Sequence, residues 1–347
     1  SGKTHTIAAL CRIYKTNIVI TTKKKAVIKR LMSGLTTLLE QDGISVGRRI
    51  GGDPYNDFDV TVCTMQMLPS FDDDDDIRVL IFDEVHNAAA DQVSVEIMAL
   101  DNAVKFGLSA TIKDRFDGKE LLLEGLFGPI VFELTDQEAE EKERVCPQKV
   151  FCMTVDEGPD TDTWKAPMTK ERYAIIRNKC RNQIARDVAG IAPEHQQLLI
   201  FVRTEEHGNV LMEEFGESMG FEFYHSGKKD RELSDMQSRF ESGELLRIIS
   251  TDSLGEGVDP EKLMILIDMN WTTSRAQVSQ RVGRNRRHAE GKDFGVVIAF
   301  HDDFDMKCAK KAKDRLKVYS SRGYELIENC TVDDIQFCGA VENGSRH

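Results

Sequence analysis

Short apolar segments alternate with longer amphipathic segments along most of the chain, and this alternation constrains the fold more than any other feature. The short segments have the length and composition of buried strands, and helical periodicity follows most of them. Such an order predicts parallel sheets with helices on their faces, because parallel neighbours need a crossover connection. The expected strands are 17–22, 59–64, 78–83, 104–109, 149–155, 198–202, 221–224, 247–251, 263–268 and 295–300. The expected helices are 4–14, 24–41, 88–100, 170–190, 205–219, 231–241 and 274–287.

Two polar stretches, 135–144 and 156–167, interrupt the alternation on either side of one expected strand. Polar stretches with glycine and proline are typical of linkers between domains. A chain of 347 residues is also long enough for two domains. We therefore expect one domain over residues 1–147, a second over 148–325, and a C-terminal tail over 326–347.

The composition argues against several classes of protein. Acidic residues outnumber basic ones by 59 to 46, which argues against a protein that coats nucleic acid without discrimination. No apolar run approaches the ~18 residues of a membrane helix and no export signal is visible, so we expect a cytoplasmic protein without a membrane partner. None of the eight cysteines forms a Cys-x-x-Cys pair, which favours reduced thiols over a zinc site or a disulfide framework.

The chain opens on Ser1-Gly2-Lys3-Thr4, the second half of the phosphate-binding pattern G-x-x-x-x-G-K-[ST]. In that pattern, backbone N–H groups at a helix N-terminus surround phosphate oxygens, and a segment with helical periodicity does follow. Lys3 would reach the β- and γ-phosphates of a nucleotide, and the Thr4 hydroxyl would bind Mg²⁺. Four residues can also match by chance, because the first glycine of the pattern is missing.

An acidic pair, Asp83-Glu84, follows the apolar segment 79–82 and begins the sequence Asp-Glu-Val-His. Carboxylates at the end of a buried strand are costly unless they meet a cation or another partner. In a fold that binds phosphate groups at this edge, Asp83 would hold Mg²⁺ and Glu84 would align the attacking water. The alternative is a strand end whose acidic side chains are simply exposed.

Two later motifs carry hydroxyl and guanidinium groups. Ser109-Ala110-Thr111 follows an expected strand, where its two hydroxyls would relay between the nucleotide site and another domain, or form an ordinary turn. Four arginines lie within residues 281–287, at the end of an expected helix. Arg284 and Arg287 are three residues apart and share a face, so they would clamp a γ-phosphate as arginine fingers. The alternative is a solvated basic helix end that complements the helix dipole.

The order of these motifs, SGKT, DEVH, SAT and QRVGRNRR, resembles that of the superfamily 2 helicases and translocases of the DExH type. The resemblance implies two tandem RecA-like α/β domains, each a mostly parallel sheet with helices on both faces, with ATP and Mg²⁺ in the cleft between them. It implies catalytic roles for Lys3, Asp83, Glu84, Gln280, Arg284 and Arg287. It implies nucleotide contacts from Ser1, Gly2, Lys3, Thr4, Gly257 and Asp259, and coupling roles for His86, Ser109 and Thr111.

Further segments match the nucleic-acid contacts of this family by residue type. A hydroxyl follows the first expected strand, a glycine pair follows a basic pair, and a T-x-Q sequence ends another strand. An Arg-Thr pair opens the second domain, and a threonine begins a T-x(5)-G-x-D segment. The resemblance implies nucleic-acid contacts from Thr22, Gly51, Gly52, Thr64, Gln66, Arg203, Thr204 and Thr251.

Within the superfamily, residues 106–111 and 126–129 resemble the UvsW-type helicases of phages, and more distantly XPB-like and RadD-like helicases. Members unwind or anneal branched DNA and migrate junctions. The resemblance therefore implies a monomer that acts on single-stranded or branched DNA in repair and recombination, in the host cytoplasm if a phage encodes it. Because DExH motifs occur in enzymes that act on DNA and in enzymes that act on RNA, the alternative is an RNA-dependent ATPase.

The start of the chain departs from the family pattern. It has no Q motif for adenine, no first P-loop glycine, no preceding strand and no accessory DNA-binding domain. We therefore expect an N-terminally truncated fragment that hydrolyses ATP poorly as it stands. An alternative from a different class is a non-catalytic nucleic-acid-binding module, which the incomplete P-loop supports and the intact DEVH and arginine motifs oppose.

Overall fold

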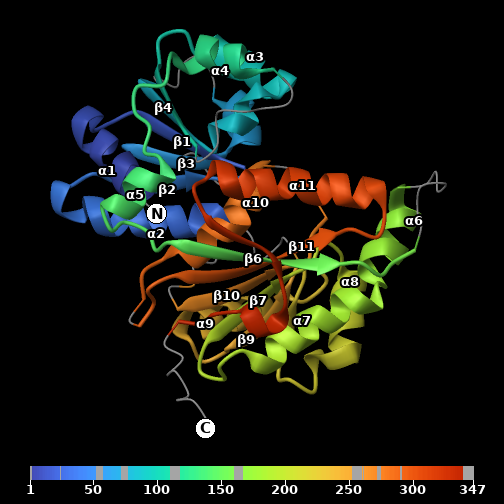
Figure 1. Ribbon diagram of the computed structural model, residues 1–347. Helices are drawn as coiled ribbons and strands as arrows, with labels where there is room; N and C mark the ends of the chain where they lie inside the picture. Colours follow the sequence, from blue (N-terminus) through green and yellow to red (C-terminus); the bar gives the residue numbers. More distant parts are fainter. Residues whose placement is uncertain are drawn as a thin grey trace. The chain divides into compact units, whose positions relative to one another are not determined.

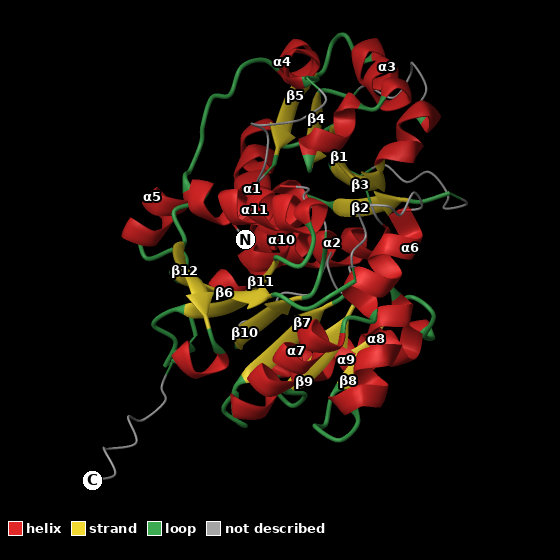
Figure 2. Cartoon of the chain, turned by 45° about the vertical axis from the view of Figure 1, so that its right-hand side comes forward, coloured by secondary structure: helices red, strands yellow, loops and turns green. Residues whose placement is uncertain are grey.

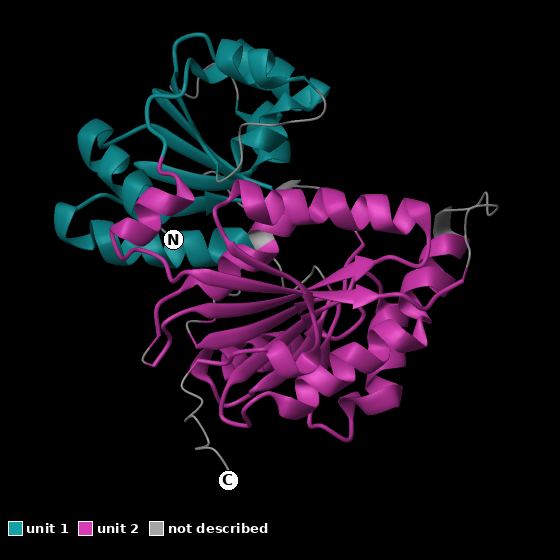
Figure 3. Ribbon diagram, viewed as in Figure 1, with its two compact units in different colours: residues 1–133 teal, residues 134–347 magenta. Residues whose placement is uncertain are grey.

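The computed structural model describes residues 2–23, 25–51, 58–71, 77–109, 118–159, 167–251, 260, 262–271, 275–289 and 291–338. The chain divides into two compact units, residues 1–133 and 134–347, and each is a parallel sheet between helices (Figure 1, Figure 2, Figure 3). Every strand pairing in both sheets is parallel. The predicted α/β class with two parallel sheets is confirmed. Among the described residues, no helix combines the length and the apolar composition needed to cross a membrane.

Unit 1 contains a five-stranded sheet in the order β2-β3-β1-β4-β5. Its strands are β1 (Ile18–Thr22), β2 (Val46–Arg49), β3 (Val60–Thr64), β4 (Val79–Asp83) and β5 (Val104–Leu108). Its α-helices are α1 (Gly2–Tyr14), α2 (Lys25–Leu39), α3 (Asp91–Ala99) and α4 (Glu120–Phe127). Short 3₁₀ turns are η1 (Glu40–Asp42), η2 (Met65–Ser70) and η3 (Val85–Ala89).

The core of unit 1 has two layers, one on each face of the sheet. Because side chains alternate along a strand, Ile18 and Ile20 of β1 face α1 and α2, whereas Val19 faces the other side. That other side is covered by η2, η3, α3 and α4. The central strands β1, β3 and β4 are therefore buried on both faces, as is usual in a parallel sheet.

Unit 2 contains a seven-stranded sheet in the order β12-β6-β11-β10-β7-β9-β8. Its strands are β6 (Gln148–Val155), β7 (Gln197–Phe201), β8 (Glu222–Tyr224), β9 (Arg247–Ser250), β10 (Leu263–Asp268), β11 (Gly295–Asp302) and β12 (Glu325–Cys330). Its α-helices are α5 (Asp136–Glu141), α6 (Pro167–Glu171), α7 (Lys179–Ile191), α8 (Glu205–Leu211), α9 (Asp230–Ser242), α10 (Arg275–Val282) and α11 (Met306–Ser321). It also has π-helical turns η4 (Arg172–Ile176) and η5 (Met212–Gly216), and 3₁₀ turns η7 (Gly283–Arg286) and η8 (Val332–Asp334).

The expected strands all form, within a few residues of the expected bounds. The helix expected over 170–190 is instead broken, because η4 interrupts it and α7 starts anew at the cap residue Asn178. Two edge strands, β2 and β12, and the helices α4 and α5 were not predicted. These two strands are partly exposed and contain charged residues, so they lack a continuous apolar signal.

The division into compact units differs from the expected domain bounds. The units divide between Glu133 and Leu134, because α5 is tied to the rest of unit 2 by ion pairs of Arg286 with Asp136 and Glu140. The expected tail over 326–347 begins inside β12, which pairs with β6 as the edge strand of the sheet. Both differences arise from contacts between residues far apart in the chain.

Candidate functional site

Parallel pairing brings the described site residues of unit 1 to one edge of its sheet. The carboxyl ends of β1, β3 and β4 are Thr22, Thr64 and Asp83, and Ser109 follows the end of β5. In parallel sheets, ligands bind at the carboxyl ends of the strands. The helix α1 begins at Gly2 on the same edge, because its Lys3 contacts the residues that follow β4.

Lys3 forms ion pairs with both carboxylates of the acidic motif. Its Nζ donates a hydrogen bond to Glu84 Oε1 and lies 3.4 Å from Asp83 Oδ1. Burial acts to lower the pKa of Lys3, but the charges of Glu84 and Asp83 outweigh it, so this pKa is raised. Burial raises the pKa of Asp83, against the opposing charge of Lys3. The two motifs that the sequence places 80 residues apart therefore meet as one cluster.

Glu84 adopts a left-handed backbone conformation, with φ 55° and ψ 56°. This region is uncommon for residues other than glycine and costs of order 1–3 kcal/mol. Two hydrogen bonds hold the strained turn, one from the Glu84 N–H to Asp83 Oδ1 at 3.1 Å and one from Asn87 Nδ2 to the Glu84 carbonyl at 3.0 Å. The strain directs the Glu84 carboxylate to Lys3, and such strain is characteristic of functional sites.

His86 connects Glu84 to the end of the neighbouring strand. Its Nδ1 lies 3.3 Å from Glu84 Oε2 and 3.2 Å from Ser109 Oγ. Asn87 Oδ1 accepts from Lys23, so its Nδ2 is the group that lies 3.2 Å from His86 Nε2 and donates to it. With Nε2 as the acceptor, Nδ1 is the ring nitrogen that faces both Ser109 Oγ and Glu84 Oε2.

The remaining predicted residues of unit 1 differ in exposure. Thr22 and Thr64 are buried and lie opposite each other in register. Gln66 and Gly51 are exposed, and Thr4 is half-buried in the first turn of α1. Ser1, Gly52, Thr111, Gly257 and Asp259 lie outside the described residues, and so does the side chain of Gln280.

The predicted nucleic-acid residues of unit 2 lie at the carboxyl edge of its sheet. Arg203 follows β7, and its Nη1 donates to Glu171 Oε2 at 2.7 Å. The Thr204 hydroxyl caps α8 by accepting from the His207 N–H at 3.2 Å. Thr251 follows β9 and is buried. The sequence indicated neither the ion pair of Arg203 nor the capping role of Thr204.

The four arginines near the end of α10 divide into two pairs. Arg281 is buried beside Asp268, with 3.3 Å between Nε and Oδ1, and Arg286 is buried against Asp136 and Glu140. Arg284 and Arg287 are only half-buried, and the Arg284 guanidinium lies 5.6 Å from the centre of the Phe201 ring. The two arginines predicted as fingers are thus the two that keep solvent exposure.

A buried ion cluster at the carboxyl end of β11 was not predicted. Asp302 forms ion pairs with Arg181 and with Arg315, the latter at 3.2 Å, and all three side chains are almost completely buried. Beside Arg181, the neighbouring Asn182 Oδ1 lies 3.3 Å from His207 Nε2. Burial lowers the pKa of His207 to about 3, and Arg181 contributes in the same direction. The sequence signal that could have predicted this cluster is Arg181, because it lies among the buried, mostly apolar positions of α7.

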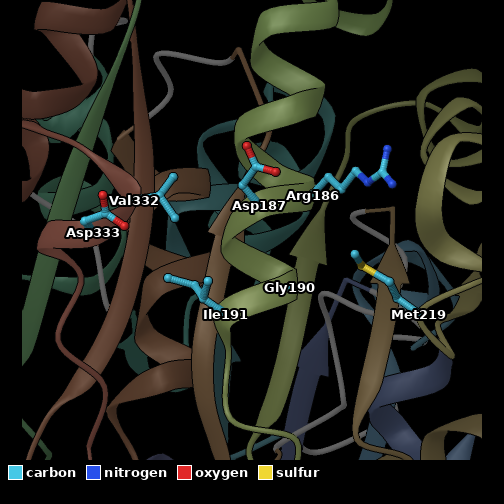
Figure 4. A pocket seen from close by; sticks show the side chains of 7 residues that line it. All are labelled: Arg186, Asp187, Gly190, Ile191, Met219, Val332 and Asp333. Carbon is cyan, nitrogen blue, oxygen red and sulfur yellow. The ribbon is translucent and has the colours of Figure 1, made fainter. Parts of the chain in front are cut away.

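The described residues contain no group of three or more His, Cys, Asp or Glu side chains that would hold a metal ion by itself. A surface hollow of about 420 Å³ lies beside α7, between Arg186, Asp187, Met219 and Asp333 (Figure 4). None of the predicted site residues lines it. The cluster around Lys3 is an arrangement in the described part of unit 1 that can bind a charged ligand.

Two family models match the chain, one in each unit. Residues 1–114 match the family described as "Type III restriction enzyme, res subunit", and residues 182–289 match "Helicase conserved C-terminal domain". Together, these two matches support the superfamily 2 helicase family for the chain. The matched segments contain the SGKT and DEVH motifs in unit 1 and all four arginines of the α10 region in unit 2.

Proteins similar to this chain include viral, bacterial and yeast helicases. Helicase 22 of Sulfolobus islandicus filamentous virus is 28% identical over 250 residues, which cover 67% of this chain and 44% of that protein. The Mycobacterium smegmatis helicase Lhr bound to ssDNA and AMP-PNP matches with a TM-score of 0.59 at 20% identity, over 92% of this chain and 45% of that one. Saccharomyces cerevisiae Dbp5 bound to RNA and ADP BeF3 matches with a TM-score of 0.65 at 15% identity, over 94% and 82%. These likenesses confirm the fold of two tandem RecA-like domains.

Proposed function

We propose that this protein is an ATP-driven motor that moves along nucleic acid, with DNA as its track. The observation that carries the proposal is the contact of Lys3 with Asp83 and Glu84 at the carboxyl edge of the unit 1 sheet. One cation against two carboxylates leaves excess negative charge, which suits a divalent metal held together with nucleotide phosphates. The two family matches support the same chemistry.

The residues present fit Mg²⁺ and ATP. The Thr4 hydroxyl and the Asp83 carboxylate are oxygen ligands of the kind that Mg²⁺ prefers. Asp83 has a raised pKa because it is buried, so a second cation beside it would be stabilising. Gly2 opens the 13-residue helix α1, and a Cβ at Gly2 would contact nothing within 4 Å, which leaves room for phosphate. When bound, Mg²⁺ would neutralise charge on the phosphate oxygens.

Each residue of the cluster then has a definite task. The Lys3 ammonium binds phosphate oxygens, and the Glu84 carboxylate orients the water that attacks the γ-phosphorus as the bond to the β–γ bridging oxygen breaks. His86 connects Glu84 to Ser109, and so to the following segment with Thr111. We assign Gln280, Arg284 and Arg287 to the γ-phosphate, and Ser1, Gly257 and Asp259 to the nucleotide.

We assign nucleic-acid contacts to the carboxyl edges of both sheets. In unit 1 these are Thr22, Gly51, Gly52, Thr64 and Gln66, and in unit 2 they are Arg203, Thr204 and Thr251. Hydroxyls, backbone amides and an arginine bind phosphate without reading sequence. The likeness to Lhr, a helicase solved with single-stranded DNA, supports DNA, and we further propose UvsW-type action on branched DNA by a monomer. The likeness to Dbp5, solved with RNA, supports RNA as the second candidate.

The variant Glu84→Gln tests the proposal. It keeps the size of the side chain but removes the carboxylate, so ATP binding should persist while hydrolysis falls by roughly 10²–10⁴-fold. The matched control is Glu40→Gln, at an exposed glutamate of the same unit. Binding of a fluorescent ATP analogue and release of phosphate are measured with matched DNA and RNA oligonucleotides. Wild-type turnover in the Glu84 variant would contradict the assignment, and stronger stimulation by RNA would favour the second candidate.

A further inference from the structure

Between α6 and α7, three exposed side chains lie next to three buried ones in the same short stretch. Within the π-helical turn η4, Ala174, Ile175 and Ile176 are buried, and the first two pack with Trp271 and Cys308. Arg172, Tyr173 and Arg177 are exposed in the same six-residue stretch, 172–177, with 48% of Tyr173 accessible to solvent. π-helical turns inside helices are frequent at functional sites. The turn therefore holds two guanidinium groups and an aromatic ring at the surface.

Ion pairs connect this turn to the residues that follow β7. Arg172 Nε and Arg177 Nη2 both bind Glu206 Oε1, at 2.7 Å and 3.1 Å. Arg203 binds Glu171, the residue directly before the turn, at 2.7 Å. The side chains of Arg172, Arg177 and Arg203 are 51%, 49% and 55% exposed. Three half-exposed arginines thus lie on adjacent parts of one surface, and one of them, Arg203, is itself a predicted nucleic-acid residue.

We propose that Arg172, Tyr173, Arg177 and Arg203 form a binding surface for single-stranded nucleic acid, here called the η4 surface. This proposal rests on the proposed function and extends the nucleic-acid contacts of unit 2 from the predicted Arg203 to Arg172, Tyr173 and Arg177, which lie outside the predicted motifs. Guanidinium groups bind phosphate bidentately, and an exposed tyrosine provides a face on which a base stacks. Two buried residues of the turn pack against Trp271 and Cys308, and this packing reduces the conformational entropy that is lost on binding.

The surrounding charges favour a nucleic-acid strand over an acidic peptide. The carboxylates Glu171 and Glu206 hold the guanidinium groups in place, and Glu205 is turned to His225, with 3.3 Å between Oε1 and Nδ1. Lys311, which lies 3.4 Å from the centre of the Trp271 ring, adds a further positive charge near Arg203. Arginines interleaved with an aromatic residue are the pattern of single-strand binding, whereas an acidic peptide has no use for the tyrosine face.

Binding of a fluorescent oligothymidylate, followed by anisotropy over a series of salt concentrations, tests the η4 surface. Tyr173→Ala should weaken binding roughly tenfold, and Tyr173→Phe should restore it, because phenylalanine keeps the stacking face. The double variant Arg172→Ala/Arg177→Ala should lower the slope of log affinity against log salt by about 1.4, since each lost phosphate contact on a single strand contributes about 0.7. The control is Arg186→Ala, an exposed arginine at the hollow beside α7.

The outcomes separate this proposal from the proposed function. If the wild-type chain binds the oligonucleotide and the η4 variants bind equally well, the η4 surface is overturned and the motor proposal stands. If the wild-type chain binds no nucleic acid, both proposals fall. If poly-glutamate displaces the oligonucleotide as well as unlabelled oligonucleotide does, the surface binds acidic peptides and the proposal is wrong. A variant that unfolds at the same temperature as the wild type in a thermal melt is correctly folded.

Discussion

The carboxyl edges of the two sheets carry ion clusters of opposite composition. In unit 1 one lysine meets two carboxylates, and the side chains of Lys3, Asp83 and Glu84 are 29%, 13% and 27% exposed. In unit 2 two arginines meet one carboxylate, and Arg181, Asp302 and Arg315 are at most 3% exposed. The two units share one architecture, but the ion clusters at this edge differ in charge and in exposure.

Two properties distinguish the clusters around Lys3 and Asp302, the solvent exposure of the side chains and the sign of the excess charge. A buried cluster must be satisfied within the protein, because an unpaired charge there is strongly destabilising. A partly exposed cluster contributes little to stability, and its excess charge is available to a ligand. We therefore interpret the Lys3 cluster as chemical and the Asp302 cluster as structural. The predictions below test this comparison.

The largest expected effect on stability is that of Asp302→Ala. The substitution leaves Arg181 and Arg315 buried without their common carboxylate, which should cost about 3–5 kcal/mol in the free energy of unfolding. Urea unfolding measures the change. The control is Asp303→Ala, whose side chain is 55% exposed and should matter little. Equal effects of the two substitutions would contradict the structural interpretation.

Lys3→Ala should have the opposite effect, a large loss of ATP hydrolysis with little loss of stability. Removing one group that stabilises charge in the transition state should lower ATP hydrolysis by about 10²–10³-fold. The free energy of unfolding should change by less than about 1 kcal/mol, because partly exposed ion pairs contribute little. Phosphate release and urea unfolding of the same preparation provide both numbers. A loss of stability as large as that of Asp302→Ala would mean that the Lys3 cluster is structural too.

The next effect is a dependence of stability on pH in unit 2. The pKa of His207 is lowered to about 3, so below its ordinary value of ~6.5 the unfolded chain binds a proton that the native protein does not. Stability is therefore complete above pH ~6.5 and falls by roughly 1.4 kcal/mol per pH unit below it. His207→Gln should flatten this slope, whereas His195→Gln, at an exposed histidine, should keep it. Parallel slopes for wild type and His207→Gln would refute the assignment.

The smallest effect concerns Thr204, where a predicted ligand residue is also a helix cap. Thr204→Ala removes the hydroxyl that accepts from the His207 N–H, which should cost about 0.5–2 kcal/mol. Thr204→Ser keeps the hydroxyl and should restore most of the stability. If alanine and serine unfold at the same urea concentration, the cap is not stabilising and the hydroxyl is free for phosphate alone.

Much of the fold and part of the site could be predicted from local sequence signals. Eight of the ten expected strands are central, and these gave a clear apolar signal because they are buried on both faces. The Lys3 and Asp83-Glu84 motifs were found because phosphate chemistry needs those residue types at a helix start and a strand end. The break at Arg172–Ile176 was missed, because its buried and exposed residues continue the periodicity of an amphipathic helix.

The sequence by itself determined the order of the elements, the parallel pairing and the edge at which functional side chains gather. These follow from hydrophobic periodicity and from the geometry of crossover connections, which are local. Only the tertiary structure decided which charged side chains become partners, because ion pairs such as Arg181 with Asp302 join residues more than a hundred positions apart. It also decided that Arg281 and Arg286 are buried while Arg284 and Arg287 keep solvent exposure, since burial depends on which surfaces pack against the 3₁₀ turn at Gly283–Arg286.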